Sequence, residues 1–147
     1  MINLRELTKL LDDLTMDNYS TLVEELCYIN PRDINGELIK CPSIFAYWNG
    51  ALATVKRDRD TQELKVNTFI AESRKQCKGV NLNNKLTAKD LDDMVMSLPE
   101  YKHSNEDFIK KCEKHDMIKS LIEALYQKKD MLIQLSANQR AEIGLNK

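Results

Sequence analysis

The residues with the most evident chemistry are basic side chains that gather between positions 56 and 78. They are Lys56, Arg57, Arg59, Lys65, Arg74, Lys75 and Lys78. The aromatic residues Tyr47, Trp48 and Phe69 lie near the two ends of this run. Cations beside aromatic rings are typical of sites for a single-stranded nucleic acid, because phosphates attract positive charge and exposed bases can stack. Acidic residues interleave with the cations, so a solvated helix face with pairs inside the helix is the alternative interpretation.

No recognisable catalytic constellation accompanies these cations. His115 follows Cys112 by three residues and forms one partial metal face, and His103 is the only other histidine. A helix-face histidine without a metal is the simpler interpretation. The acidic cluster over 90–93 favours stabilisation of a helix N-terminus over a Mg²⁺ site. Four scattered glycines cannot build a phosphate-binding loop. The sequence therefore predicts a protein that is not an enzyme and has neither a metal nor a cofactor.

Composition restricts the class of protein. The chain has 147 residues, of which 42% are hydrophobic and 31% charged, with 22 basic and 23 acidic side chains and a net charge of −1. This composition suits a folded domain and argues against a disordered tail. No apolar stretch approaches the roughly 20 residues of a membrane span, and no secretory signal begins the sequence. The cysteines form no CxxC pair, which favours reduced thiols in a cytoplasm. These are Cys27, Cys41, Cys77 and Cys112.

The elements that must position the basic residues are helices. With only 4 Gly and 3 Pro, the sequence favours an all-α fold. One long helix is expected over 42–78, with Pro42 as its first residue and Gly79 as its C-cap. A short helix should begin after a capping box at Thr87 and end before Pro99. A second long helix is expected over 105–140, opened by a capping device over 104–107. Two long helices joined in this way predict an antiparallel hairpin.

The apolar residues of the first long helix recur at heptad spacing. They are Phe45, Trp48, Leu52, Val55, Val66 and Phe69. Because a helix of about 36 residues extends about 54 Å, it needs a partner along its length, and we assign these residues, with Leu125 and Leu132, to an oligomer interface. Trp48 and Phe69 therefore suit a core or interface better than base stacking. Arg59 and Gln62 interrupt the stripe, which indicates either a register-fixing polar contact or a section that projects past its partner.

Charge is distributed unevenly along the chain. Residues 1–41 carry 4 basic and 8 acidic side chains, whereas residues 42–86 carry 8 basic and 4 acidic ones. Helices are expected over 4–13 and from Asp17 or Ser20 to Ile29, followed by a loop or short hairpin at the Asn35-Gly36 signal. The sequence thus predicts two domains, an acidic helical arm over 1–41 and a hairpin domain over 42–147. The arm is expected to contact a partner protein or to shield the basic region.

The arrangement from residue 42 to residue 144 resembles the UvsY-type recombination mediators of tailed bacteriophages. The segments that carry the resemblance are Pro42–Trp48, the basic stretch before Gly79, Lys85–Asp90, Leu121–Leu125 and Arg140-Ala141. The resemblance implies a ring-like homo-oligomer that binds single-stranded DNA in the cytoplasm of a bacterial host. It further implies that the protein helps to load a RecA-like phage recombinase by displacing single-strand-binding protein. The alternative is a helical structural or adaptor protein that oligomerises without binding nucleic acid.

Overall fold

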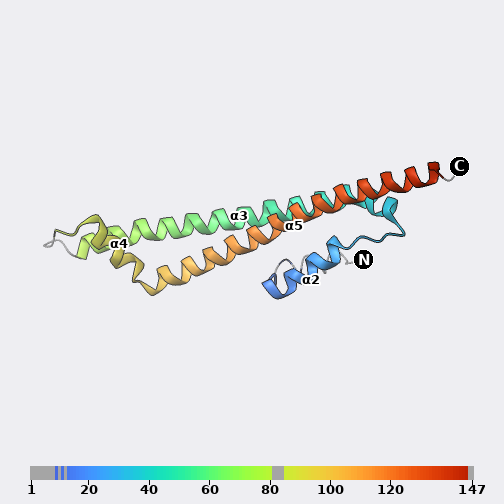
Figure 1. Cartoon of the computed structure of the whole chain (residues 1–147). Helices are drawn as coiled ribbons and strands as arrows, with labels where there is room; N and C mark the ends of the chain where they lie inside the picture. The colour runs from blue at the N-terminus through green and yellow to red at the C-terminus, as the bar shows by residue number, and fades with distance from the viewer. Residues whose placement is uncertain (1–8, 10, 12, 81–84, 146–147) are drawn as a thin grey trace. The chain divides into compact units, whose positions relative to one another are not determined.

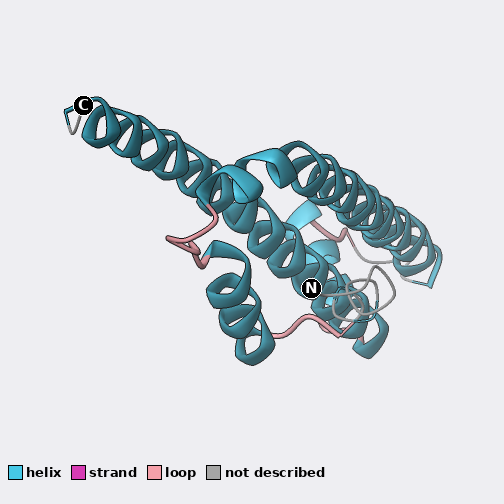
Figure 2. Ribbon diagram, turned by 90° about the vertical axis from the view of Figure 1, so that its right-hand side faces the viewer, coloured by secondary structure: helices cyan, strands magenta, loops and turns pink. Residues whose placement is uncertain are grey.

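The computed structural model describes residues 9, 11, 13–80 and 85–145 of the chain. Their helices are α2 (Met16–Cys27), α3 (Ile34–Val80), α4 (Ala88–Met96) and α5 (Pro99–Leu145), labelled in Figure 1. Figure 2 shows helices and loops, and no strand occurs among the described residues. The all-α prediction is confirmed.

The helix α2 begins earlier than the sequence indicates. Its N-cap is Thr15, in place of Asp17 or Ser20, because the side-chain oxygen of Asn18 accepts the Thr15 N–H at 2.7 Å. The amide nitrogen of the same Asn18 donates to the carbonyl of Asp13 at 2.7 Å, which fixes the entry of the chain into the helix. The helix ends at Cys27, two residues before the expected end. The helix expected over 4–13 falls largely on residues outside the described part of the chain.

The helix α3 contradicts the predicted boundary at Pro42, because it begins eight residues earlier at Ile34. A carboxylate oxygen of Asp33 accepts the Gly36 N–H at 3.1 Å, and the Asp33 carbonyl accepts the Glu37 N–H at 3.0 Å. Asp33 therefore caps the helix and takes the Asn35-Gly36 pair into its first turn. Gly36 permits this approach, since a Cβ there would collide with the Asp33 carboxylate.

Pro42 lies inside α3 and leaves one carbonyl of the preceding turn without its helical partner. Side-chain donors serve the carbonyls around it: the Cys41 thiol donates to the Glu37 carbonyl at 3.4 Å, and the Ser43 hydroxyl donates to the Lys40 carbonyl at 2.9 Å. At the other end α3 continues through the expected C-cap Gly79 to Val80, and no described glycine has positive φ. The Asn-rich loop expected over 81–84 lies outside the described residues.

The capping box of α4 is confirmed. The Thr87 hydroxyl accepts the Asp90 N–H at 3.2 Å, and the Asp90 carboxylate accepts the Thr87 N–H at 2.8 Å. The expected start of α5 near Ser104 is wrong, since the helix begins at Pro99. Proline is favoured as the first residue of a helix, and here it starts α5 immediately after the short helix ends. The last helix also extends to Leu145, beyond the expected end at residue 140.

Packing divides the chain into two compact units. Unit 1 comprises Met1–Ala53 and Asp116–Lys147, and unit 2 comprises Thr54–His115. The buried apolar side chains of unit 1 are Leu22, Ile34, Trp48, Ile118, Leu121, Ile122, Leu125 and Leu132. Those of unit 2 are Val55, Val66, Leu91 and Val95. The proposed division of the chain at residue 41/42 into an acidic arm and a hairpin domain stays a prediction.

Candidate nucleic-acid interface

Most of the predicted basic residues lie exposed on the part of α3 that belongs to unit 2. Exposed are Lys56, Arg57, Lys65, Arg74, Lys75 and Lys78, whereas Arg59 is half-buried. Two basic doublets, Lys56-Arg57 and Arg74-Lys75, are 18 residues apart, which equals five turns of an α-helix. Both doublets therefore point to the same side of α3. The buried stripe of this helix, which includes Val66, faces the other way.

The two polar residues of the predicted stripe face α5 within unit 2. The amide nitrogen of Gln62 donates to the Ser104 carbonyl at 3.1 Å and to its hydroxyl at 3.3 Å. A guanidinium nitrogen of Arg59 lies 3.4 Å from Nδ1 of His115. These contacts fix the register of α3 against α5 within one chain. Ser104, which the sequence predicted to cap a helix, instead accepts hydrogen bonds from the buried side-chain amide of Gln62.

Arg59 and Lys65 lie off the side of α3 that the two doublets share. Arg59 is half-buried beside α5, and Lys65 is exposed but follows Lys56 by nine residues, which is two and a half helical turns. The Arg59 guanidinium donates to the Asp60 carboxylate from Nε at 3.0 Å and from Nη2 at 2.7 Å. The hydrogen bonds to Asp60 raise the pKa of Arg59, while desolvation opposes that shift. The charge of Arg59 is thus permanent, and it neutralises that of its neighbour Asp60.

Arg74 has a partner that the sequence did not indicate. Its Nε donates to Oδ1 of Asp92 in α4 at 2.8 Å, and its Nη2 donates to the same oxygen. The packing of α4 places this carboxylate, because Leu91 and Val95 are buried in unit 2 while the neighbouring Asp92 is half-buried. A phosphate that binds Arg74 must compete with Asp92. No local pattern relates two residues 18 positions apart in different helices, so sequence reasoning missed the pair.

The residues assigned to an oligomer interface are covered to different degrees within one chain. Trp48, Val55, Val66, Leu125 and Leu132 are buried. Half-buried are Phe45, Leu52 and Phe69. In unit 1 the Phe45 ring stacks on Tyr126 of α5, with ring centroids 4.4 Å apart. The chain thus supplies its own partner for much of this stripe, and a contact of the same residues between copies stays a prediction.

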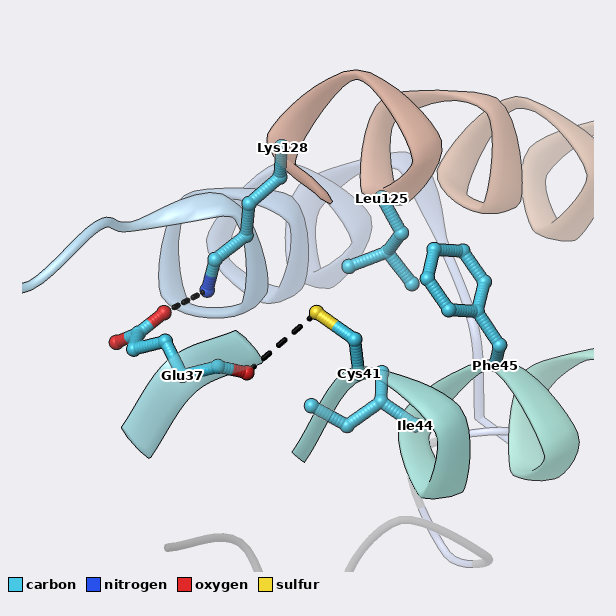
Figure 3. A pocket seen from close by; sticks show the side chains of 6 residues that line it. All are labelled: Glu37, Cys41, Ile44, Phe45, Leu125 and Lys128. Atoms are coloured by element: carbon cyan, nitrogen blue, oxygen red, sulfur yellow. Dashed lines mark hydrogen bonds and ion pairs between the residues drawn. The ribbon is translucent and has the colours of Figure 1, made fainter. Parts of the chain in front are cut away.

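Unit 1 holds a largely buried ion pair that sequence reasoning did not find (Figure 3). Nζ of Lys128 lies 2.7 Å from Oε2 of Glu37 and donates to the Leu26 carbonyl at 2.9 Å. The side chains of Lys128 and Glu37 are only 12% and 19% exposed. The pair joins α3, α5 and the C-terminal end of α2. The sequence feature that could have indicated this buried pair is the position of Lys128 between Leu125 and Leu132 on the apolar stripe of α5.

The thiol of Cys41 and the imidazole of His103 are far apart in the sequence and have different surroundings. The thiol of Cys41 projects beside the Glu37–Lys128 pair in Figure 3. Burial raises the pKa of Cys41, and the nearby Lys128 only partly opposes that shift, so this thiol is a poor nucleophile at neutral pH. His103 is 81% exposed and lies 3.7 Å from Asp107 in the same helix. No group of three metal-ligating side chains gathers in the part of the chain that the structure describes.

Comparisons of the chain with family models, with curated proteins and with solved structures find no match. Within the described ranges, no helix combines the length and the apolar character that crossing a membrane requires.

Proposed function

We propose that the chain binds single-stranded DNA through the exposed basic side of α3 in unit 2. The observation that carries the proposal is the repetition of a basic doublet, Lys56-Arg57 and Arg74-Lys75, five helical turns apart on one side of the helix. Lys78 follows one turn after the second doublet and adds a further cation. Such a row can contact phosphates at several points without reading sequence.

The wider proposal is a recombination mediator of a tailed bacteriophage, acting in the cytoplasm of the bacterial host. The mediator displaces single-strand-binding protein and helps to load a RecA-like recombinase, a task that needs binding surfaces but no covalent chemistry. The two long helices form one antiparallel hairpin, and the hairpin associates with copies of itself, as a ring in the form that the resemblance implies. A ring repeats a weakly basic surface, so several contacts act together and raise the avidity for one strand.

The test is a triple variant, Arg74→Ala, Lys75→Ala and Lys78→Ala, titrated with a fluorescent oligothymidylate at two salt concentrations. The variant should bind more weakly than the wild type and with a smaller salt dependence, because fewer counterions are released. A matched control removes three exposed lysines from α5, at Lys102, Lys110 and Lys119, with the same change in charge. Equal losses in both variants would show a general charge effect and contradict the proposed site.

The same measurement separates the proposal from the structural or adaptor protein. If the triple variant at 74, 75 and 78 and the wild type bind DNA equally or not at all, the basic side of α3 has another purpose. In that case Leu52→Asp, at a half-buried residue of the predicted interface, should still disrupt an assembly of copies, which light scattering would detect as a loss of mass.

A further inference from the structure

The outward side of α3 has an internal pattern that net charge alone does not describe. Counting from the first basic doublet, positions on this side recur at intervals of three and four residues. They are Arg57, Asp60, Leu64, Asn67, Ala71, Arg74 and Lys78. All seven are exposed, and all lie in the helical segment of unit 2. The stripe therefore has cations at both ends and a centre without free positive charge.

The centre of this stripe carries little net charge and includes one large apolar side chain. Leu64 is 66% exposed and offers an aliphatic surface to a ligand. Asn67 and Ala71 follow on the same side and carry no charge. The one charged residue of the centre, Asp60, is held by Arg59 at 2.7 Å. A ligand that fits this surface has anionic groups about 27 Å apart and an apolar, uncharged portion between them.

We infer that one unpaired DNA strand lies along this side of α3, with phosphates at both basic doublets and base faces against Leu64 between them. The inference rests on the proposed DNA binding and adds the path of the strand. A duplex hides its base faces within the stack, whereas a single strand can turn them toward an apolar side chain. At about 3.4 Å per nucleotide for a stacked strand, 27 Å corresponds to at most about eight nucleotides, and a strand with unstacked bases spans it with fewer.

The first test compares oligothymidylates of 4, 8, 12 and 16 nucleotides by fluorescence anisotropy. A strand of 4 nucleotides reaches one doublet, whereas a strand of 12 reaches both, and the second contact is then intramolecular. The affinity should rise by about tenfold between 4 and 12 nucleotides and by about twofold or less from 12 to 16. An affinity that grows evenly with length over the whole series would overturn the inference.

The second test removes one doublet by the double substitution Lys56→Ala and Arg57→Ala. For 4 nucleotides the loss should be about twofold, because one of two similar sites remains. For 12 nucleotides the loss should be about tenfold, because the simultaneous contact is gone. If the affinity of this variant still rises about tenfold from 4 to 12 nucleotides, the longer strand bridges two copies of the chain, which contradicts a path along one α3. If the wild type binds none of the oligonucleotides, the proposed function itself fails, so the two failures are distinguishable.

The third test addresses the contact with bases. Leu64→Ser should weaken binding of the 12-nucleotide strand about threefold, because aliphatic surface that the bases cover is lost, and leave binding of an abasic strand of the same length unchanged. The matched control is Ile109→Ser, which removes another exposed aliphatic side chain, 47% accessible, from α5 of the same unit. Equal effects of Leu64→Ser on both strands, or a change of mass by light scattering without a change in DNA binding, would assign Leu64 to another role.

Discussion

Replacing Asp92 by asparagine removes the carboxylate that holds Arg74 while it keeps the size of the side chain. Both donors of Arg74 bond the same oxygen of Asp92, and the two side chains are 48% and 37% exposed. An ion pair this exposed contributes about 0.2–1 kcal/mol. A phosphate that must displace Asp92 loses that amount of binding free energy. Asp92→Asn should therefore raise the affinity for an oligothymidylate about 1.4- to fivefold.

The control is Asp93→Asn, which makes the same change in net charge one residue further along α4. Asp93 is exposed, and its side chain forms no ion pair with a described residue. Long-range attraction of DNA increases equally in both variants, so the excess gain in Asp92→Asn measures the release of Arg74. The assay is fluorescence anisotropy at low salt, repeated with each substitution in an Arg74→Ala background, where the excess should vanish. Equal gains for the two variants, or an excess that persists without Arg74, would refute the competition between Asp92 and phosphate.

Three further predictions concern stability and reactivity. Lys128→Met should lower the free energy of unfolding by about 3 kcal/mol in urea titrations, because it leaves Glu37 charged and largely buried. Adding Glu37→Leu should restore much of that loss. An unchanged urea midpoint for Lys128→Met would show that the ion pair does not stabilise the fold. Hydrogen bonds from the Thr87 hydroxyl, and to a smaller extent from the Thr87 backbone N–H, lower the pKa of the Asp90 carboxyl. The carboxylate therefore stabilises the folded chain above the ordinary pKa of 3.8, and this stabilisation is lost as pH falls through the lower pKa of the folded state. The urea midpoint of the wild type should therefore fall more between pH 5 and pH 3 than that of Asp90→Asn, and equal falls would contradict this. Because burial raises the pKa of Cys41 above 9.0, its alkylation rate by iodoacetamide should still increase above pH 9.0 in peptide mapping, whereas a plateau below that pH would contradict the burial.

Local signals in the sequence predicted some helix boundaries and failed at others. The start of α4 was predicted correctly because Thr87 and Asp90 are three residues apart and complete their capping box without help from the rest of the fold. The start of α3 was wrong because the Asn35-Gly36 pair suggested a turn, whereas capping by Asp33 draws that pair into the helix. At Ser104 a capping pattern suggested a helix start, but the residue lies inside α5 and accepts from Gln62.

The heptad pattern identified the packed side of α3 but could not identify what covers it. Val55 and Val66 are buried as the spacing required, and the polar Gln62 between them is buried too because Ser104 accepts its hydrogen bonds. The pairing of Arg74 with Asp92 depends on how α4 packs against α3, which no local spacing encodes. The sequence therefore indicated which residues were basic and exposed, but not which of them already has a carboxylate partner.

The central claim, that the basic side of α3 binds an unpaired strand, is tested most directly by the salt dependence of the affinity for a 12-nucleotide oligothymidylate. Five outward cations, at positions 56, 57, 74, 75 and 78, should give a slope of log K against log salt of about −3.5 per chain. The triple variant at 74, 75 and 78 should reduce the slope to about −1.4. Absence of binding at low salt, or a wild-type slope that the triple variant leaves unchanged, would contradict the claim.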